Sequence, residues 1–293
     1  MDSFIQYLIA GVILGSLYSF MAVGFVTLYK CTKVPNFAQG AFGVVAAYVT
    51  WWLISRQHAP FVLAAIAGCT ASGLTGYLAD RTAMRRMLGA PVISLIIFTY
   101  GLDTALTSAA QEIWGPQIEL LKLPESTSFF TVAGLSIQYT DVIILVIGML
   151  VPIACWAFFK YTRLGMATRA TATSRTWPSL IGINVPSVMS FSWTLAGVLG
   201  GLAGVFLSGV YYLEPSLMDT FLLPAFTAAA LGGFGSILGA YVGGLILGIA
   251  QDLSGGYLGP SWTTYSAYIV LFIVLMIRPQ GLFKTAVSHN PLA

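Results

Sequence analysis

Asp103 is the residue whose type and position point most directly to chemistry. It follows Thr99-Tyr100-Gly101-Leu102 near the middle of an apolar run, 91–113, that is long enough to cross a bilayer. A carboxyl group at that depth is costly unless it is paired or hydrated. Asp103 could therefore face a solute path and meet an ammonium or other hydrogen-bond donor, or it could join two helices. From the sequence both readings stay open.

Other patterns that support catalysis or energy coupling are missing from the sequence. Lys284 is the only lysine followed by serine or threonine, and no glycine loop precedes it, so the chain lacks a phosphate-binding loop. Its two histidines, His58 and His289, form no metal or catalytic motif. We therefore expect no catalytic site, no metal site and no nucleotide or other cofactor bound by this chain. The sequence thus predicts that the protein is not an enzyme.

The composition defines the class of protein that must position these residues. Only 13 basic and 10 acidic residues occur among 293, while 57% of residues are hydrophobic and the mean hydropathy is +0.85. A soluble domain carries about 25% charged residues, against 8% here. Soluble enzymes and nucleic-acid binders are excluded, and the composition predicts an all-α polytopic membrane protein forming one transmembrane domain over 1–293.

Eight apolar segments supply the spans. Seven are predicted to cross the membrane once, and the eighth, 223–250, is interrupted by Gly232-Gly233-Phe234-Gly235-Ser236. Because such an interruption breaks a helix, we expect a re-entrant pair of half-helices there. The seven single spans are 4–28, 40–55, 60–79, 91–113, 140–160, 188–210 and 263–277.

The basic residues predict the orientation of these spans. Cytoplasmic loops of membrane proteins carry an excess of lysine and arginine. An outside N-terminus places 161–187 in the cytoplasm and 114–139 outside. The C-terminus, with Arg278 and Lys284, is cytoplasmic only if 223–250 returns to the side from which it enters. The positive-inside rule therefore supports the re-entrant pair.

Two interruptions, one in each half of the chain, indicate where a solute could pass. Pro35-Asn36-Phe37-Ala38-Gln39-Gly40 breaks the first half, as 232–236 breaks the second. Paired breaks of this kind mark transport sites between helices. Other glycines at GxxxG spacing, such as Gly11/Gly15 and Gly244/Gly248, are better explained by helix packing. The predicted path residues are Asn36, Gln39, Asp103, Gly232, Gly233 and Gly235.

The cytoplasmic loop 161–187 is the most polar inner segment. A short helix is expected over 165–175, followed by a second helix with Pro178 in its first turn. This second helix presents Leu180 and Ile181 before Gly182 ends it. Two short helices of this kind could form a docking knob, or the segment could be an ordinary connection.

Four motifs in order resemble the inner-membrane permeases of the branched-chain amino acid class of ABC importers, of LivH type. Related permeases for urea, short amides and aromatic acids belong to the same group. The resemblance covers essentially the whole chain, and each motif alone is weak. The motifs are 36–40 (NFAQG), 169–172 (RATA) leading to 182–184 (GIN), 226–236 (FTAAALGGFGS) and 278–283 (RPQGLF).

This resemblance implies a permease subunit of the bacterial inner membrane that works by alternating access. A second permease, a paralogue in a heterodimer, would complete the pore. Two ATP-binding subunits would hold ATP and magnesium, and a solute-binding protein would deliver a branched-chain or related amino acid. The residues implied in contact with the ATP-binding subunits are Arg169, Arg175, Pro178, Leu180, Ile181 and Gly182.

Departures from the family pattern leave the solute open. Gln39 stands where a histidine is commoner, and Asp103 stands where a small polar residue is usual. Ser174, Trp177 and Pro178 also replace the usual residues before the Gly-Ile pair. A self-sufficient secondary carrier or channel for a small polar solute is the alternative function, although one intramembrane acid makes no proton relay.

Overall fold

Helices dominate the computed structural model, which describes residues 2–87, 90–124, 129–132, 135–173, 178, 180–278 and 280–283. They are α1 (Asp2–Thr32), α2 (Gln39–Gln57), α3 (Phe61–Ala79), the π-helical turn η1 (Asp80–Met84), α4 (Val92–Trp114), α5 (Tyr139–Tyr161), α6 (Arg163–Thr173), α8 (Val185–Val210), α9 (Leu217–Gly232), α10 (Ile237–Leu258) and α11 (Ser261–Ile277).

The predicted helical membrane class is confirmed. In the described part of the chain, six helices are long and apolar enough to cross a bilayer, namely α1, α3 extended through η1, α4, α5, α8 and α10. Helices α9 and α11 are apolar but shorter. All eight predicted apolar segments are therefore helical, and the second of them begins at Gln39.

One element departs from the all-α prediction. Within the predicted external loop 114–139, β1 (Phe129–Val132) pairs antiparallel with β2 (Leu135–Gln138), with Phe129 opposite Gln138. Short β-strands alternate polar and apolar residues over too few positions to stand out from a loop.

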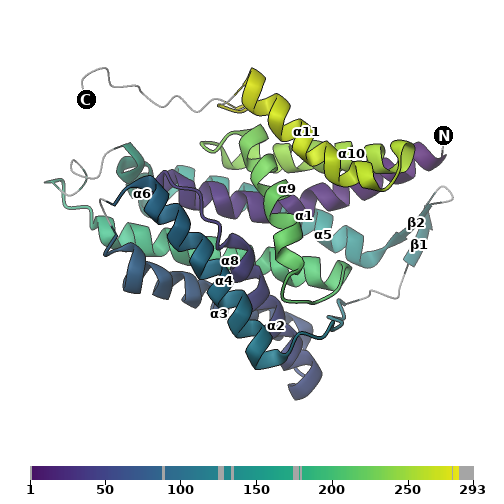
Figure 1. The fold of residues 1–293 in the computed structure, drawn as a ribbon, viewed down its shortest axis with the longest axis horizontal. Coiled ribbons are helices and arrows are strands. Elements are labelled where there is room, and N and C mark those ends of the chain that lie inside the picture. Colours follow the sequence, from purple (N-terminus) through teal and green to yellow (C-terminus); the bar gives the residue numbers. More distant parts are fainter. Residues whose placement is uncertain are drawn as a thin grey trace.

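Helices α1 and α10 lie antiparallel in direct backbone contact (Figure 1). Gly15 faces Gly244, where a Cβ added at Gly15 would come within 2.7 Å of the Gly244 carbonyl oxygen. Nearby, the Ser19 hydroxyl donates a hydrogen bond to the Tyr241 carbonyl at 3.0 Å. Small residues at GxxxG spacing allow this close approach. The predicted packing role of these glycines is confirmed.

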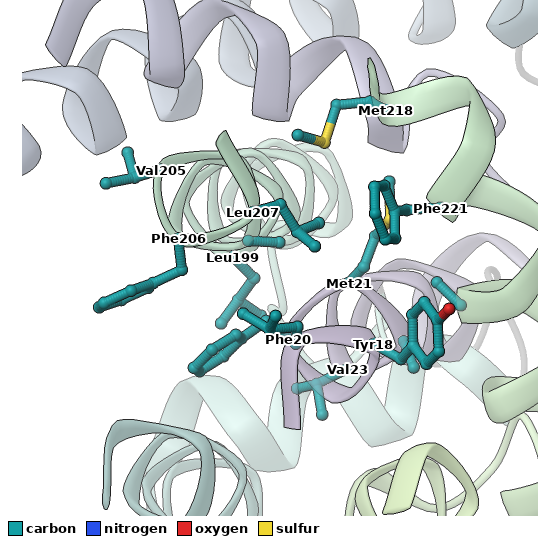
Figure 2. Packing of buried hydrophobic residues seen from close by; sticks show 14 of the residues in the cluster. Tyr18, Phe20, Met21, Val23, Leu199, Val205, Phe206, Leu207, Met218 and Phe221 are labelled. Atoms are coloured by element: carbon teal, nitrogen blue, oxygen red, sulfur yellow. The ribbon is translucent and has the colours of Figure 1, made fainter. Parts of the chain in front are cut away.

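The largest core forms where α1, α8 and α9 meet (Figure 2). There the rings of Phe20 and Phe206 stack with centroids 5.7 Å apart. Helix α1 is mostly buried, whereas α4, α5 and α11 expose many large apolar side chains. A helix that is apolar and exposed suits a lipid environment. The labelled core residues in Figure 2 are Tyr18, Phe20, Met21, Val23, Leu199, Val205, Phe206, Leu207, Met218 and Phe221.

The predicted break in the apolar segment 223–250 is present. Helix α9 ends at Gly232, Gly233 has a φ of +94°, and Ser236 caps α10 by accepting a hydrogen bond from the Gly239 N–H at 2.9 Å. The chain then runs back along α1. The prediction of two half-helices was wrong for α10, because its 22 residues are enough for a full crossing. The break was also expected at mid-depth, yet Phe234 packs on Tyr29 at the C-terminal end of α1.

Candidate functional site

The N-terminus of α2 lies inside the helix bundle. The Gln39 side chain packs against Gly24 of α1, and its Nε2 donates a hydrogen bond to the Ala196 carbonyl of α8 at 2.9 Å. The first N–H groups of a helix have no partner within it and must find one elsewhere. In a buried position, that partner must be another part of the protein.

Asp103 supplies such a partner from α4. Its Oδ1 accepts a hydrogen bond from the Ala41 N–H at 3.0 Å, and only 7% of the residue is exposed. Asn36 and Thr99 act alongside it, accepting hydrogen bonds from the N–H groups of Ala38 and Phe37 at 3.1 and 3.2 Å. Asp103 thus joins α4 to α2, which supports the structural reading of this acid.

Asp103 also lines a cavity of about 410 Å³ between α4 and α9. Its α4 residues recur at spacings of three and four, so they form one polar face of that helix. Polar side chains at membrane depth need water, a solute or another protein against them. The structure therefore also supports the path reading of Asp103. The lining residues are Tyr100, Asp103, Thr104, Thr107, Ser108, Asp219 and Leu222.

Asn36 and Gln39 hold the start of α2 in place. Both are buried, and the Asn36 Nδ2 donates a hydrogen bond to the Gln39 Oε1 at 3.5 Å. Their other side-chain hydrogen bonds join them to the backbone of Ala38, which precedes α2, and of Ala196 in α8. They contact the same structural unit as Asp103, so the three residues predicted from scattered positions do converge.

The three glycines of the break lie away from that cavity. Gly232 packs against Gly239, and Gly233 turns the chain beside residues 280–283. Gly235 lines a second cavity together with Lys30. Since Asp219 and Gly232 lie at opposite ends of α9, the helix rise separates them by about 20 Å. The predicted path residues thus divide into two groups.

The sequence motifs that are far apart in the chain meet around α9. Phe37 of the first motif stacks on Phe226 of the third, with ring centroids 6.1 Å apart. In the fourth motif, the Leu282 N–H donates to the Leu231 carbonyl at 2.8 Å, and the Phe283 N–H donates to the Gly232 carbonyl at 3.2 Å. The last carbonyls of α9 are satisfied in this way.

The segment predicted to contact ATP-binding subunits is only partly described. Helix α6 runs over Arg163–Thr173 and carries Arg169, whereas Arg175 lies outside the described residues. Pro178 is buried, and Leu180 and Ile181 are 70% and 76% exposed. The chain turns at Gly182, which has a φ of +84°, and the Ile183 N–H donates to the Pro178 carbonyl at 3.0 Å. This bond is typical of a helix end.

A polar cluster at Asp80 was missed in the sequence. Asp80 is fully buried, its Oδ2 accepts a hydrogen bond from the Ser190 hydroxyl at 2.6 Å, and an Arg85 guanidinium nitrogen lies 3.5 Å away. Arg85 also donates to the Pro186 carbonyl at 3.3 Å. The cluster ties η1 to the start of α8, directly after the exposed Leu180–Gly182 turn.

The spacing explains why this pair was overlooked. Residues five apart do not face each other on an α-helix. They do in η1, where the Arg85 N–H bonds the Asp80 carbonyl at 2.9 Å. Asp219 was not among the predicted path residues, yet it faces the same cavity as Asp103. No periodicity in the sequence signals either contact.

Comparison with known proteins gives consistent results over nearly the full length. A family model described as "Branched-chain amino acid transport system / permease component" matches residues 7–278. The high-affinity branched-chain amino acid transport system permease protein LivH of Escherichia coli is 30% identical over 95% of both chains. BraD of Pseudomonas aeruginosa, of the same description, is 29% identical over 95% of both chains.

Among solved structures, PsaBC from Streptococcus pneumoniae in complex with Fab gives a TM-score of 0.47 at 15% identity. The alignment covers 95% of this chain and 91% of that chain. A score below 0.5 supports no argument about the fold.

Proposed function

This chain belongs to the family of branched-chain amino acid transport system permease components, and we propose that it is the membrane-spanning subunit of an ABC importer in the bacterial inner membrane. The family match over 7–278 carries the proposal. The relatives are permease proteins of transporters rather than enzymes. The chain's own apolar helices make it a multi-pass membrane protein.

The solute is proposed to be a branched-chain or related amino acid that crosses by alternating access. The polar face of α4, with Asp103 and the α4–α9 cavity, supports a path along this helix. One open face on one chain is half of such a path, so a second permease, a paralogue in a heterodimer, would provide the other wall. The glycine break 232–236 would serve as a turn at the inner end of this path.

The positions of the helix ends support the proposed orientation. We place the N-terminus outside and the C-terminus in the cytoplasm. The N-terminal end of α1 lies beside the C-terminal end of α10, since the ring centroids of Tyr7 and Tyr257 are 5.7 Å apart. The opposite ends of these two helices, at Lys30 and Ile237, line one cavity together with Lys160 of α5 and Arg169 of α6. Basic residues gathered at one end support a cytoplasmic face there.

Energy would come from two ATP-binding partners, which would hold the ATP and magnesium. The exposed apolar turn at Leu180 and Ile181 supports a docking contact with them. The cluster of Asp80, Arg85 and Ser190 would transmit movement of that turn to α3 and α8. A solute-binding protein would deliver the solute at the outer face.

Reconstitution of the chain with its partners in proteoliposomes tests this function. We expect uptake of labelled leucine that requires ATP and the solute-binding protein. A screen of ligands by thermal shift of that binding protein then identifies the solute class. Solute flux through vesicles that contain this chain alone would instead support a self-sufficient carrier or channel. Absence of ATP-dependent uptake for every ligand that the binding protein recognises would refute the importer proposal.

A further inference from the structure

Three helix ends and helix α6 surround a cavity of about 660 Å³ at the basic end of the molecule. The C-terminal ends of α1 and α5, helix α6 and the N-terminal end of α10 all contribute to it. Since α1 and α5 end there, the cavity lies at the level where spanning helices leave the bilayer. Its lining residues are Lys30, Trp156, Phe159, Lys160, Arg169, Gly235, Ser236, Ile237, Leu282 and Phe283.

The charges in this cavity have one sign. Lys30, Lys160 and Arg169 line it, and none of the described lining residues is acidic. The Arg169 guanidinium donates a hydrogen bond to the Lys160 backbone carbonyl at 3.4 Å, and this bond joins α6 to the end of α5. In the described residues neither lysine forms an ion pair. Like charges gathered in a partly enclosed space repel one another, so an anion between them would be strongly favoured.

The start of α10 adds to this preference for an anion. Ser236 and Ile237 line the cavity at the N-terminal end of a 22-residue helix. The N-terminal end of a helix carries a partial positive charge and favours negative groups. Three cationic side chains therefore share the cavity with a helix end of the same electrostatic sign.

The apolar surroundings indicate an anion that is attached to a hydrocarbon chain. Lys160 Nζ lies 4.6 Å from the centre of the Trp156 ring, an arrangement of lysine and tryptophan that suits the membrane interface. Trp156 and Lys160 share one face of α5 with Met149 and Ile153, which are 56% and 40% exposed. This exposed apolar strip runs from the cavity toward the middle of the bilayer and offers a surface for an acyl chain.

We propose that this cavity binds the phosphate group of an anionic phospholipid, with Lys30 and Lys160 as the principal contacts. Basic pockets between spanning helices on the cytoplasmic side suit such headgroups. The site is separate from the α4–α9 cavity, so the proposal does not depend on which solute is transported. A free phosphate ion offers the same charge without the acyl chain, and the test must separate these two sources.

The test compares the full-length chain in vesicles of phosphatidylcholine alone and of phosphatidylcholine mixed with phosphatidylglycerol. Two readouts are used: the lipid retained on the purified protein by native mass spectrometry, and the thermal unfolding midpoint. Wild-type protein should retain phosphatidylglycerol and unfold at higher temperature in the mixture. The double variant Lys30→Gln/Lys160→Gln should bind this lipid roughly thirtyfold more weakly, the effect of losing two cationic contacts at about 1 kcal/mol each.

Arg163→Gln is the matched control, because Arg163 is an exposed cation at the start of α6 that does not line the cavity. It should retain lipid like the wild type. Lys160→Gln alone provides a second variant if the double variant folds poorly, since each protein is compared with itself in the two lipid mixtures. Equal lipid retention by wild type and the lysine variants would overturn the proposal. So would an equal stabilisation by inorganic phosphate in detergent, which would indicate a small-anion site.

Discussion

Replacing Asp103 with alanine should destabilise the protein by removing the partner of a buried helix N-terminus. The Ala41 N–H would lose its acceptor at 3.0 Å, in a place that is shielded from water. Leaving a buried donor unsatisfied costs about 1–3 kcal/mol. Asp103→Asn keeps an oxygen at the same position and loses only the charge, so it should cost about 1 kcal/mol or less.

Asp219→Ala is the matched control for the loss of charge. Asp219 lines the same cavity from α9 but is exposed, and among the described residues its side chain makes no hydrogen bond to a helix end. The assay is thermal unfolding of the purified chain in one detergent. A loss of about 2 kcal/mol corresponds to a midpoint lowered by roughly 4–8 °C for Asp103→Ala. Asp219→Ala should change the midpoint by much less.

Uptake measured on the same variants separates the two roles of Asp103. If the acid only caps α2, Asp103→Asn should transport at the wild-type rate with unchanged specificity. If it also contacts the solute in the α4–α9 cavity, Asp103→Asn and Asp219→Asn should both reduce uptake while remaining folded. Equal destabilisation by Asp103→Ala and Asp219→Ala would refute the capping argument, because only one of the two acids contacts the N-terminus of α2.

Three further predictions concern packing, coupling and orientation. Gly15→Ala should destabilise the chain by about 1–3 kcal/mol in thermal unfolding, because the added Cβ meets the backbone of α10, whereas Gly101→Ala, with open space around it, should not. Leu180→Ala/Ile181→Ala should leave the unfolding midpoint unchanged but abolish solute-stimulated ATP hydrolysis by the reconstituted complex; normal stimulation would contradict the docking contact. A membrane-impermeant maleimide added outside intact cells should label Leu258→Cys and not Leu180→Cys, and the reverse pattern would show that the proposed orientation is inverted.

Local sequence patterns predicted the helices well. Apolar runs of about 20 residues are sufficient to define spanning helices, because backbone groups in lipid must be satisfied within the segment. The break at 232–236 was also visible, since successive glycines remove side chains that would hold a helix and allow a positive φ. Gly182 ended its helical turn for the same reason. Each of these features depends on residues that are neighbours in the chain.

Other features of the fold could not be predicted in this way. The depth of the glycine turn beside Tyr29 depends on how far α10 slides along α1, which the contacts of Gly15 and Gly244 determine. The pairing of Asp80 with Arg85 depends on the π-helical turn, which has no recognised sequence signal at this position. The hairpin in 114–139 was too short to show a clear alternation.

By itself, the sequence determined that this protein is a helical membrane permease whose apolar segment 223–250 is broken. Tertiary structure decided which distant residues meet. Asp103 reaches Ala41, Phe37 stacks on Phe226, and Lys30 shares a cavity with Lys160, although each pair is far apart in the chain. Periodicity reports the face on which a residue lies, but the partner on that face depends on helix crossing and register, which are set by side chains from several helices at once.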